Sequence, residues 1–374
     1  MKILVIRFSS LGDVLLTTPI VRSIRKNYPS AEIHFLTKKE FAPILENNPN
    51  INQIIKYDNK NDRFIDIIKL IANSQYDLII DLQSKLNSFL IKLFAGNSKH
   101  VTYNKRHFYR WRLTHKSLSK NLAPIKSTVS LYSTVLDKLG IKLDAEKLDI
   151  FLPKNQDEIY STFRIPHSEF RISISPGATH FTKQYPANYY SQLINMITDK
   201  LNAQIILLGS KNEKKLTAQI ANGCKKKILD LAGETDIMDM AVIIKNSELF
   251  ISGDCGPMHI AAALNIPQIA IFGPTHPKLG FAPINTNAVI IQKDLSCRPC
   301  SLHGREKCPK THFKCMMDIK PEEILTKIEM LSIPNPQLSP IKSGLRRTGA
   351  VRYLHMKHTC PENKSGHKVA LKLH

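Results

Sequence analysis

The sequence predicts an α/β protein with two Rossmann-like domains that face each other across a cleft. Apolar runs of strand length alternate with helical segments over most of the chain, and this series starts twice. At 374 residues the chain is also long enough to bury two separate cores. Alternating strands and helices indicate parallel sheets that are covered by helices on both faces.

The first series lies in the N-terminal part of the chain. Its apolar runs predict strands, and its helical periodicity and helix-end signals predict helices between them. We expect strands at 2–7, 32–37, 53–57 and 77–82, and helices at about 13–27, 62–73 and 127–139.

The second series begins after Pro166. We expect strands at 171–175, 203–208, 228–231, 248–252 and 268–272, and helices at 187–201, 213–223, 236–245 and from Gly256 onward. A last helix begins with Lys320-Pro321-Glu322-Glu323, since proline and acids favour a first turn. The domains are therefore expected at 1–160 and 161–319, followed by a helix at 320–333 and a basic, flexible tail at 334–374.

Charge narrows the classes of partner. Lys and Arg number 53 against 31 Asp and Glu, and a net charge of +22 attracts polyanions such as nucleic acid, anionic lipid or a phosphorylated substrate. Residues 99–120 mix cations with aromatics, a pattern typical of a lipid headgroup layer or single-stranded nucleic acid, although a solvated basic loop also fits. The sequence contains no nucleic-acid-binding motif, so we do not expect a nucleic-acid partner.

The chain has no run of 18 apolar residues, and its first apolar run is too short for the core of a signal peptide. We therefore expect a cytoplasmic protein.

Four of seven cysteines cluster as Cys297-x2-Cys300-x7-Cys308-x6-Cys315. A zinc site, a redox-sensitive disulfide pair and an unligated cluster all remain open from this spacing.

The first strand leads into Ser9-Ser10-Leu11-Gly12-Asp13-Val14. This turn lacks the GxGxxG fingerprint of a bound dinucleotide. It places the carboxylate of Asp13 at a helix start beside the expected cleft, where it can act as a general base on a hydroxyl. A simple helix-capping role is the alternative.

Turns in the second half carry groups suited to a diphosphate and a ribose. After the strand at 171–175, Gly177 permits close approach of a ligand, Thr179 donates a hydrogen bond and Lys183 neutralises charge. Glu213 follows the next strand, where a ribose is often held. Each feature also has a structural alternative, a surface loop for the first and a first-turn acid for the second.

A further strand runs into Asp254-Cys255-Gly256-Pro257-Met258-His259 and then an alanine-rich helix. The unpaired amides and the dipole of a helix N-terminus form an anion site, and Gly256 lets the ligand come close. Asp254 can accept from a sugar hydroxyl. An ordinary helix start is the alternative, but these turns all lie at the carboxyl ends of strands, where ligands bind in open α/β sheets.

Together these motifs resemble glycosyltransferase family 9, the ADP-heptose-dependent heptosyltransferases of lipopolysaccharide inner-core synthesis. The resemblance covers about 1–330, with Tyr185 where the family often has Trp. It implies a GT-B architecture, an acceptor-binding N-terminal half, a donor-binding C-terminal half, and metal-independent transfer with inversion and no cofactor. By resemblance Asp13 is the catalytic base, Lys183 and Thr179 bind phosphate, and Glu213 binds ribose.

The resemblance also places Asp254, Gly256 and His259 in the donor motif, and we expect the neighbouring Ser10, Gly12, Gly177 and Cys255 to contact substrate as well. The expected partners are an ADP-sugar donor, an anionic lipid-linked glycan acceptor of the Kdo-lipid A type, and the inner-membrane surface. Alternatives are another nucleotide sugar or glycan acceptor, a relative that only binds sugar nucleotides, and a nucleic-acid-binding protein.

Overall fold

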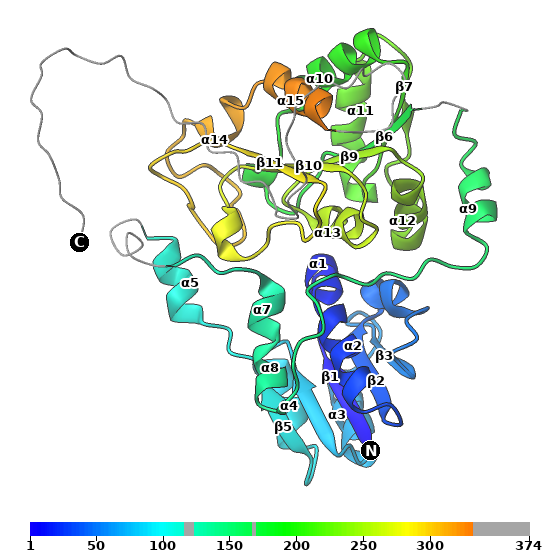
Figure 1. Ribbon diagram of the computed structural model, residues 1–374, viewed down its shortest axis with the longest axis vertical. Helices are drawn as coiled ribbons and strands as arrows, with labels where there is room; N and C mark the ends of the chain where they lie inside the picture. Colours follow the sequence, from blue (N-terminus) through cyan, green and yellow to red (C-terminus); the bar gives the residue numbers. More distant parts are fainter. Residues whose placement is uncertain (116–122, 167–169, 332–374) are drawn as a thin grey trace, which may run out of the picture.

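A computed structural model describes residues 1–115, 123–166 and 170–331. The described chain forms two parallel sheets with helices on both faces, one in each half of the chain (Figure 1). In that view the blue and cyan N-terminal half lies below the green and orange C-terminal half, and helices α1 and α13 meet between them. The predicted α/β class with two Rossmann-like domains is confirmed.

The first sheet has the strand order β3-β2-β1-β4-β5, and every neighbouring pair is parallel. Its strands are β1 (Lys2–Ile6), β2 (Glu32–Lys38), β3 (Gln53–Tyr57), β4 (Leu78–Asp81) and β5 (Lys99–Thr102). The helices of this half are α1 (Leu11–Leu15), α2 (Thr18–Asn27), η1 (Lys39–Leu45), α3 (Phe64–Asn73), α4 (Leu86–Leu93), α5 (His107–Leu113), α7 (Thr128–Tyr132) and α8 (Thr134–Asp137).

The second sheet has the order β11-β10-β9-β6-β7-β8 and is also parallel. Its strands are β6 (Phe170–Ser175), β7 (Ala203–Leu207), β8 (Leu229–Asp230), β9 (Leu249–Gly253), β10 (Gln268–Phe272) and β11 (Ala288–Gln292). The helices are α9 (Gln156–Thr162), η2 (Phe181–Lys183), α10 (Ala187–Lys200), η3 (Lys211–Glu213), α11 (Lys214–Asn222), α12 (Ile237–Lys245), α13 (Gly256–Ala263), η4 (Pro277–Leu279), α14 (Lys314–Met317) and α15 (Pro321–Met330).

The alternation of side chains along β1 explains why this strand is apolar throughout. Ile3 and Val5 pack into a core with α2 and α7, whereas Leu4 and Ile6 pack into a second core with α3 and α4. Both faces of a parallel sheet are buried, so a central strand needs apolar residues at every position.

The first of these cores continues into the second half of the chain, where it includes Phe250 of β9 and Ile260 of α13. The two halves therefore share one continuous apolar core, which passes through the contact between α1 and α13. A core of this kind resists separation of the two halves because separation would expose apolar side chains to water.

The chain crosses from the first half to the second through a segment after α8, and α9 then packs against α12 (Figure 1). Arg22 of α2 holds the start of this crossover. Its guanidinium pairs with Asp144 and Asp149, and donates to the carbonyl oxygens of Ala145 (2.9 Å) and Lys147 (3.0 Å).

Most predicted strands and helices are confirmed, with two clear errors. The helix predicted at 13–27 is two helices, because Pro19 lacks an N–H and starts α2 after a break at Leu16-Thr17. The helix predicted at 127–139 is likewise divided at Ser133 into α7 and α8. Helix α15 lies within the predicted 320–333, and the predicted tail at 334–374 lies outside the described residues.

Arg22→Met should lower the free energy of unfolding by about 2 kcal/mol, because it leaves Asp149 and two carbonyl oxygens without their donor and leaves Asp144 with Lys26 alone. Lys26→Met, which removes only an exposed pair with Asp144, should cost less than about 0.5 kcal/mol. Denaturant unfolding of both variants measures the difference. Equal losses would show that Arg22 does not fix the crossover.

Candidate active site

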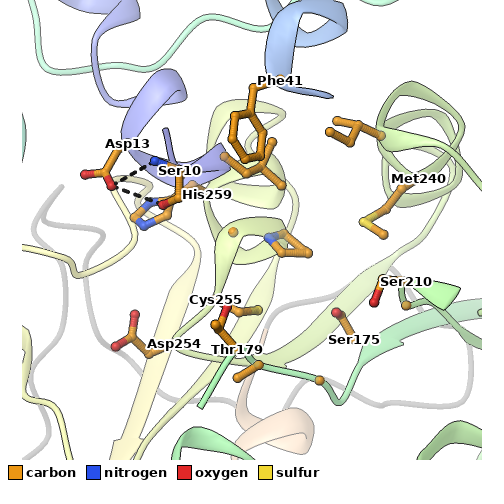
Figure 2. Close-up of a pocket in the computed structure, with 18 of the residues that line it drawn as sticks. Ser10, Asp13, Phe41, Ser175, Thr179, Ser210, Met240, Asp254, Cys255 and His259 are labelled. Atoms are coloured by element: carbon orange, nitrogen blue, oxygen red, sulfur yellow. Dashed lines mark hydrogen bonds between the residues drawn. The ribbon is translucent and has the colours of Figure 1, made fainter. Parts of the chain in front are cut away.

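A cavity of about 760 Å³ lies between the two halves, at the carboxyl ends of β1, β6, β7 and β9. All of the residues that the sequence singled out line it: Ser10, Gly12, Asp13, Gly177, Thr179, Lys183, Glu213, Asp254, Cys255, Gly256 and His259. Figure 2 shows Ser10, Asp13 and His259 at one side of the cavity, with Asp254, Cys255 and Thr179 at the other. Turns that are far apart in sequence therefore meet at one place.

Asp13 lies in the first turn of α1 and caps it. Its Oδ2 accepts from the backbone N–H (3.3 Å) and hydroxyl (3.1 Å) of Ser10, and pairs with the guanidinium of Arg7 at 2.8 Å. Its Oδ1 accepts from the hydroxyl of Tyr132 at 3.1 Å. The carboxylate thus has the capping role that sequence offered as an alternative and also faces the cavity.

The charge of Asp13 is held by its neighbours. Burial opposes ionisation, but the Arg7 guanidinium and the hydrogen bonds from Ser10 and Tyr132 outweigh it and lower the pKa of Asp13 below its ordinary value. Asp13 is therefore a carboxylate at neutral pH, fixed in orientation by three different residues. The sequence analysis did not assign a role to Arg7 or to Tyr132, which comes from α7, far along the chain.

On the opposite side of the cavity, Lys183 forms an ion pair with Asp254 at 2.9 Å. The same oxygen, Oδ2 of Asp254, accepts from the hydroxyl of Thr275 at 2.7 Å. Both side chains of the pair are largely buried. Two motifs that are 71 positions apart in the sequence are thus joined directly. Thr275 also contacts this ion pair, a role that was not assigned to it from the sequence.

Glu213 closes a hydrogen-bonded turn after β7. Its Oε2 accepts from the backbone N–H (2.7 Å) and the hydroxyl (2.9 Å) of Ser210. A Cβ on Gly177 would lie 1.6 Å from Oε1 of this carboxylate. Glycine at 177 therefore makes room for Glu213, whereas the sequence analysis attributed it to the approach of a ligand.

A similar finding applies to Gly256 at the start of α13. A Cβ there would lie 2.8 Å from Cδ2 of Leu11, and a Cβ on Gly12 would lie 2.5 Å from Cδ2 of His259. Both glycines thus permit the close packing of α1 against α13. The N-terminus of α13 still faces the cavity, with Cys255 at its N-cap and the pKa of that thiol raised to about 11 by burial.

His259 is buried at the same contact, with 4% of its surface exposed, and its Nδ1 has no hydrogen-bond partner among the described residues. Burial lowers its pKa to about 4, although the carboxylates of Asp254 and Asp13 oppose this shift. His259 is therefore a neutral imidazole between the two acids at neutral pH.

Arg110 of α5 is a cation whose position the sequence did not predict. It is only 5% exposed, and its Nε and Nη2 have no partner within the described part of the chain. The guanidinium lies over the ring of Phe281, 4.9 Å from the centroid, and Phe281 lines the cavity. The mixture of basic and aromatic residues at 99–120 predicted an interaction surface in this segment. It did not predict that Arg110 is buried, because that burial depends on contacts with the C-terminal half such as Phe281.

The cysteine-rich loop also reaches the cavity, through Leu302 and His303. Arg298 anchors the loop by donating to the carbonyl oxygens of Phe272 (3.0 Å) and Thr275 (2.7 Å) at the end of β10. Cys297, Cys300, Cys308 and Cys315 are free thiols. In residues 1–115, 123–166 and 170–331, no group of three or more His, Cys, Asp or Glu is placed to hold a metal ion.

A family model described as Glycosyltransferase family 9 (heptosyltransferase) matches residues 65–311. The chain belongs to this family. It is therefore a glycosyltransferase, and the matched residues include Lys183, Glu213 and Asp254 of the cavity lining. No helix among the described residues of this family 9 enzyme is long and apolar enough to cross a membrane.

Individual relatives agree with this assignment. Lipopolysaccharide heptosyltransferase 3 of Escherichia coli K12 is 30% identical over 71% of this chain and 80% of its own length. Lipooligosaccharide heptosyltransferase 2 of Campylobacter jejuni is 27% identical over 89% of this chain and all of its own length. The solved structure of E. coli ADP-heptose heptosyltransferase II shares the fold, with a TM-score of 0.70, 22% identity and coverage of 88% and 98%.

The stability of the folded enzyme should depend on pH through His259. Its folded pKa of about 4 lies below the unfolded value of 6.5, so the unfolded state binds the proton more tightly. The free energy of unfolding should then fall by roughly 3 kcal/mol as pH drops from 6.5 through 4. His259→Gln should flatten this pH dependence in denaturant titrations. His115→Gln, at an exposed position, should leave it unchanged, and parallel profiles for all three proteins would contradict the assignment.

Proposed function

We propose that this enzyme transfers a heptose from ADP-heptose to an inner-core acceptor of the Kdo-lipid A type, with inversion at the anomeric carbon. The observation that carries the proposal is the division of the cavity. An ionised and oriented carboxylate, Asp13, belongs to the N-terminal half, while Lys183, Thr179 and the N-terminus of α13 belong to the C-terminal half. A base on one side and anion-binding groups on the other suit displacement of a nucleotide from a sugar.

In the proposed reaction, Asp13 accepts the proton of the acceptor hydroxyl as the hydroxyl oxygen attacks the anomeric carbon. Three of the contacts to Asp13, one from Arg7 and two from Ser10, lie on Oδ2, and Oδ1 keeps a lone pair beside the Tyr132 hydroxyl. A carboxylate with a lowered pKa is a weak base, so the proton transfers late, when the attacking oxygen has become acidic.

The departing ADP carries negative charge, which the C-terminal half can stabilise with fixed donors. The ammonium of Lys183 has three N–H groups, so the pair with Asp254 leaves others for the diphosphate. Thr179 and the backbone amides in the first turn of α13 add uncharged donors. Donors that are already in place lower the barrier without having to reorganise during the reaction.

Glu213 and Asp254 are proposed to bind hydroxyl groups of the donor. Glu213 faces the cavity from the end of β7, which suits the ribose of ADP. The protein contacts of Asp254 use Oδ2, so its Oδ1 is left to accept from a heptose hydroxyl. His259, neutral between the two acids, stays a hydrogen-bonding group rather than a charge.

The acceptor side of the cavity favours an anion. Arg110, Arg7, Lys105 and Lys85 interact electrostatically in this region, and Asp13 is the carboxylate that offsets them there. Burial lowers the pKa of Lys105, and the neighbouring cations lower it further. A carboxylate or phosphate of the acceptor would relieve this repulsion and supply partners for the unpaired nitrogens of Arg110. Such an acceptor is lipid-linked, so we propose that the enzyme works on the inner face of the inner membrane.

Asp13→Asn should reduce acceptor-dependent release of ADP from ADP-heptose by at least about 10²–10⁴-fold, because an amide cannot accept the proton. ADP affinity should be retained, and activity of the unsubstituted enzyme should persist in EDTA. The exposed Asp199→Asn variant serves as the control, and circular dichroism checks folding because Arg7 loses its partner. Full activity of Asp13→Asn would show that Asp13 is not the general base. If the unsubstituted enzyme released no ADP, the enzyme would use another donor or acceptor.

Arg110→Met should raise the KM for the acceptor at least about tenfold while ADP affinity stays the same, since it removes a charged hydrogen-bond donor but keeps an apolar side chain against Phe281. Arg112→Met, on the same helix but over Phe108, is the matched control. Steady-state kinetics with varied acceptor separate the two variants. An equal effect of both would indicate general attraction of charge rather than a binding position.

A further inference from the structure

Helix α4 exposes apolar side chains where a surface helix normally has polar ones. Leu86, Phe89 and Leu93 are 69%, 56% and 62% exposed, and Phe94, just after the helix, is 54% exposed. The buried positions of the same helix are Ser88 and Ile91. A spacing of three and four residues places the exposed side chains on one face of the helix.

The neighbouring helix α3 packs against α4 and adds Ile65 and Leu70, each 47% exposed. We call the outward sides of these two helices the α3–α4 face. Of the twelve large apolar side chains that are exposed in the described residues, six belong to this face and two more to α5. Single exposed apolar residues are common on protein surfaces, but a concentration of this kind marks an interaction surface.

The charged residues around the α3–α4 face indicate what binds to it. The sequence contains no Asp or Glu from residue 82 to residue 136, whereas Lys and Arg occur seven times between residues 82 and 115. Lys92 of α4 pairs with the buried Asp81, and Lys85 at the start of the helix has no acidic partner among the residues described. On α3 the exposed Asp66 is paired with Arg63, so the cationic surroundings lie on the α4 side of the face. An apolar surface flanked by such cations complements an anionic bilayer.

The same charges disfavour two other occupants. A second copy of the chain would bring like charges together across the interface, which is repulsive. The C-terminal tail at 334–374 has eight Lys or Arg and Glu362 as its one acid, so it carries the same sign.

We propose that the α3–α4 face inserts into the headgroup region of an anionic bilayer and holds the acceptor-binding half against it. This proposal rests on the proposed function, because a lipid-linked acceptor gives membrane docking its purpose. The start of α4 lies near the acceptor side of the cavity, since Lys85 interacts with Lys105, which interacts with Asp13. A docked enzyme would therefore present its acceptor side near the membrane.

The first test measures binding to vesicles of phosphatidylethanolamine and phosphatidylglycerol by sedimentation. Replacing Leu86, Phe89 and Leu93 together by serine should weaken binding at least about tenfold, since three large apolar side chains no longer enter the bilayer. Met317→Ser/Met330→Ser, which changes exposed apolar residues of the C-terminal half, should bind like the unsubstituted enzyme. All three proteins should bind ADP equally, which shows that they are folded.

A second test places a probe on the face without making it polar. Trp111 is the one tryptophan of the chain, so Trp111→Phe with Phe89→Trp moves the fluorophore onto α4. Lipids brominated on their acyl chains should quench this fluorescence strongly, and should not quench Trp111→Phe with Met330→Trp. Unquenched fluorescence from position 89, or vesicle binding that survives the triple substitution, would overturn the proposal.

Two further outcomes keep the proposal separate from the proposed function. A dimer that the triple substitution dissociates, without any vesicle binding, would assign the face to a second copy and overturn the proposal. Transfer to a deacylated, water-soluble acceptor should be the same in the triple variant and the unsubstituted enzyme. If neither the triple variant nor the unsubstituted enzyme transferred heptose to this acceptor, the proposed reaction would be contradicted. The vesicle and quenching experiments would still show whether the α3–α4 face contacts the membrane.

Discussion

The close contact between α1 and α13 is the constraint on which the site depends. Each helix lets the other approach by presenting a glycine, Gly12 against His259 and Gly256 against Leu11. Because α1 carries Asp13 in its first turn and α13 begins at Gly256, the packing of two backbones sets how far the proposed base stands from the proposed donor-binding groups. The shared apolar core behind this contact makes that separation a property of the whole fold.

The charges of the site are balanced in pairs that lie on opposite sides of the cavity. Asp13 is matched by Arg7 and Lys183 by Asp254, so each half folds without leaving a carboxylate or ammonium unpaired in a largely buried position. Arg110 breaks this pattern, since its buried guanidinium has an aromatic ring beneath it but no paired carboxylate in the part of the chain that the structure describes. The cavity thus has internal counterions for Asp13 and Lys183, and its unpaired positive charge lies beside Arg110, on the proposed acceptor side.

The sequence predicted the parts of this protein that follow from local patterns. Buried parallel strands are apolar throughout, so β1, β6 and β9 were evident, and the residues just after them were expected in one cleft. Helix α4 was not, because apolar residues lie on both its buried and its exposed sides and no single stripe marks the buried one. Strand β5 was not, because it is a short edge strand with Lys99 and His100 exposed. The burial of Arg110 and the close packing of Leu11 against Gly256 arise from contacts between distant segments, which a single sequence does not contain.

The α1–α13 contact also restricts how the two halves can move relative to each other. Its residues line the cavity, and His259 and Leu11 each pack directly against a glycine backbone of the facing helix. A relative movement of the halves that keeps this contact would be a rotation about it. A rotation of that kind changes the width of the mouth far more than the spacing at the base. Under such a rotation the distance between Asp13 and the start of α13 would change little while the opening of the cavity changes more.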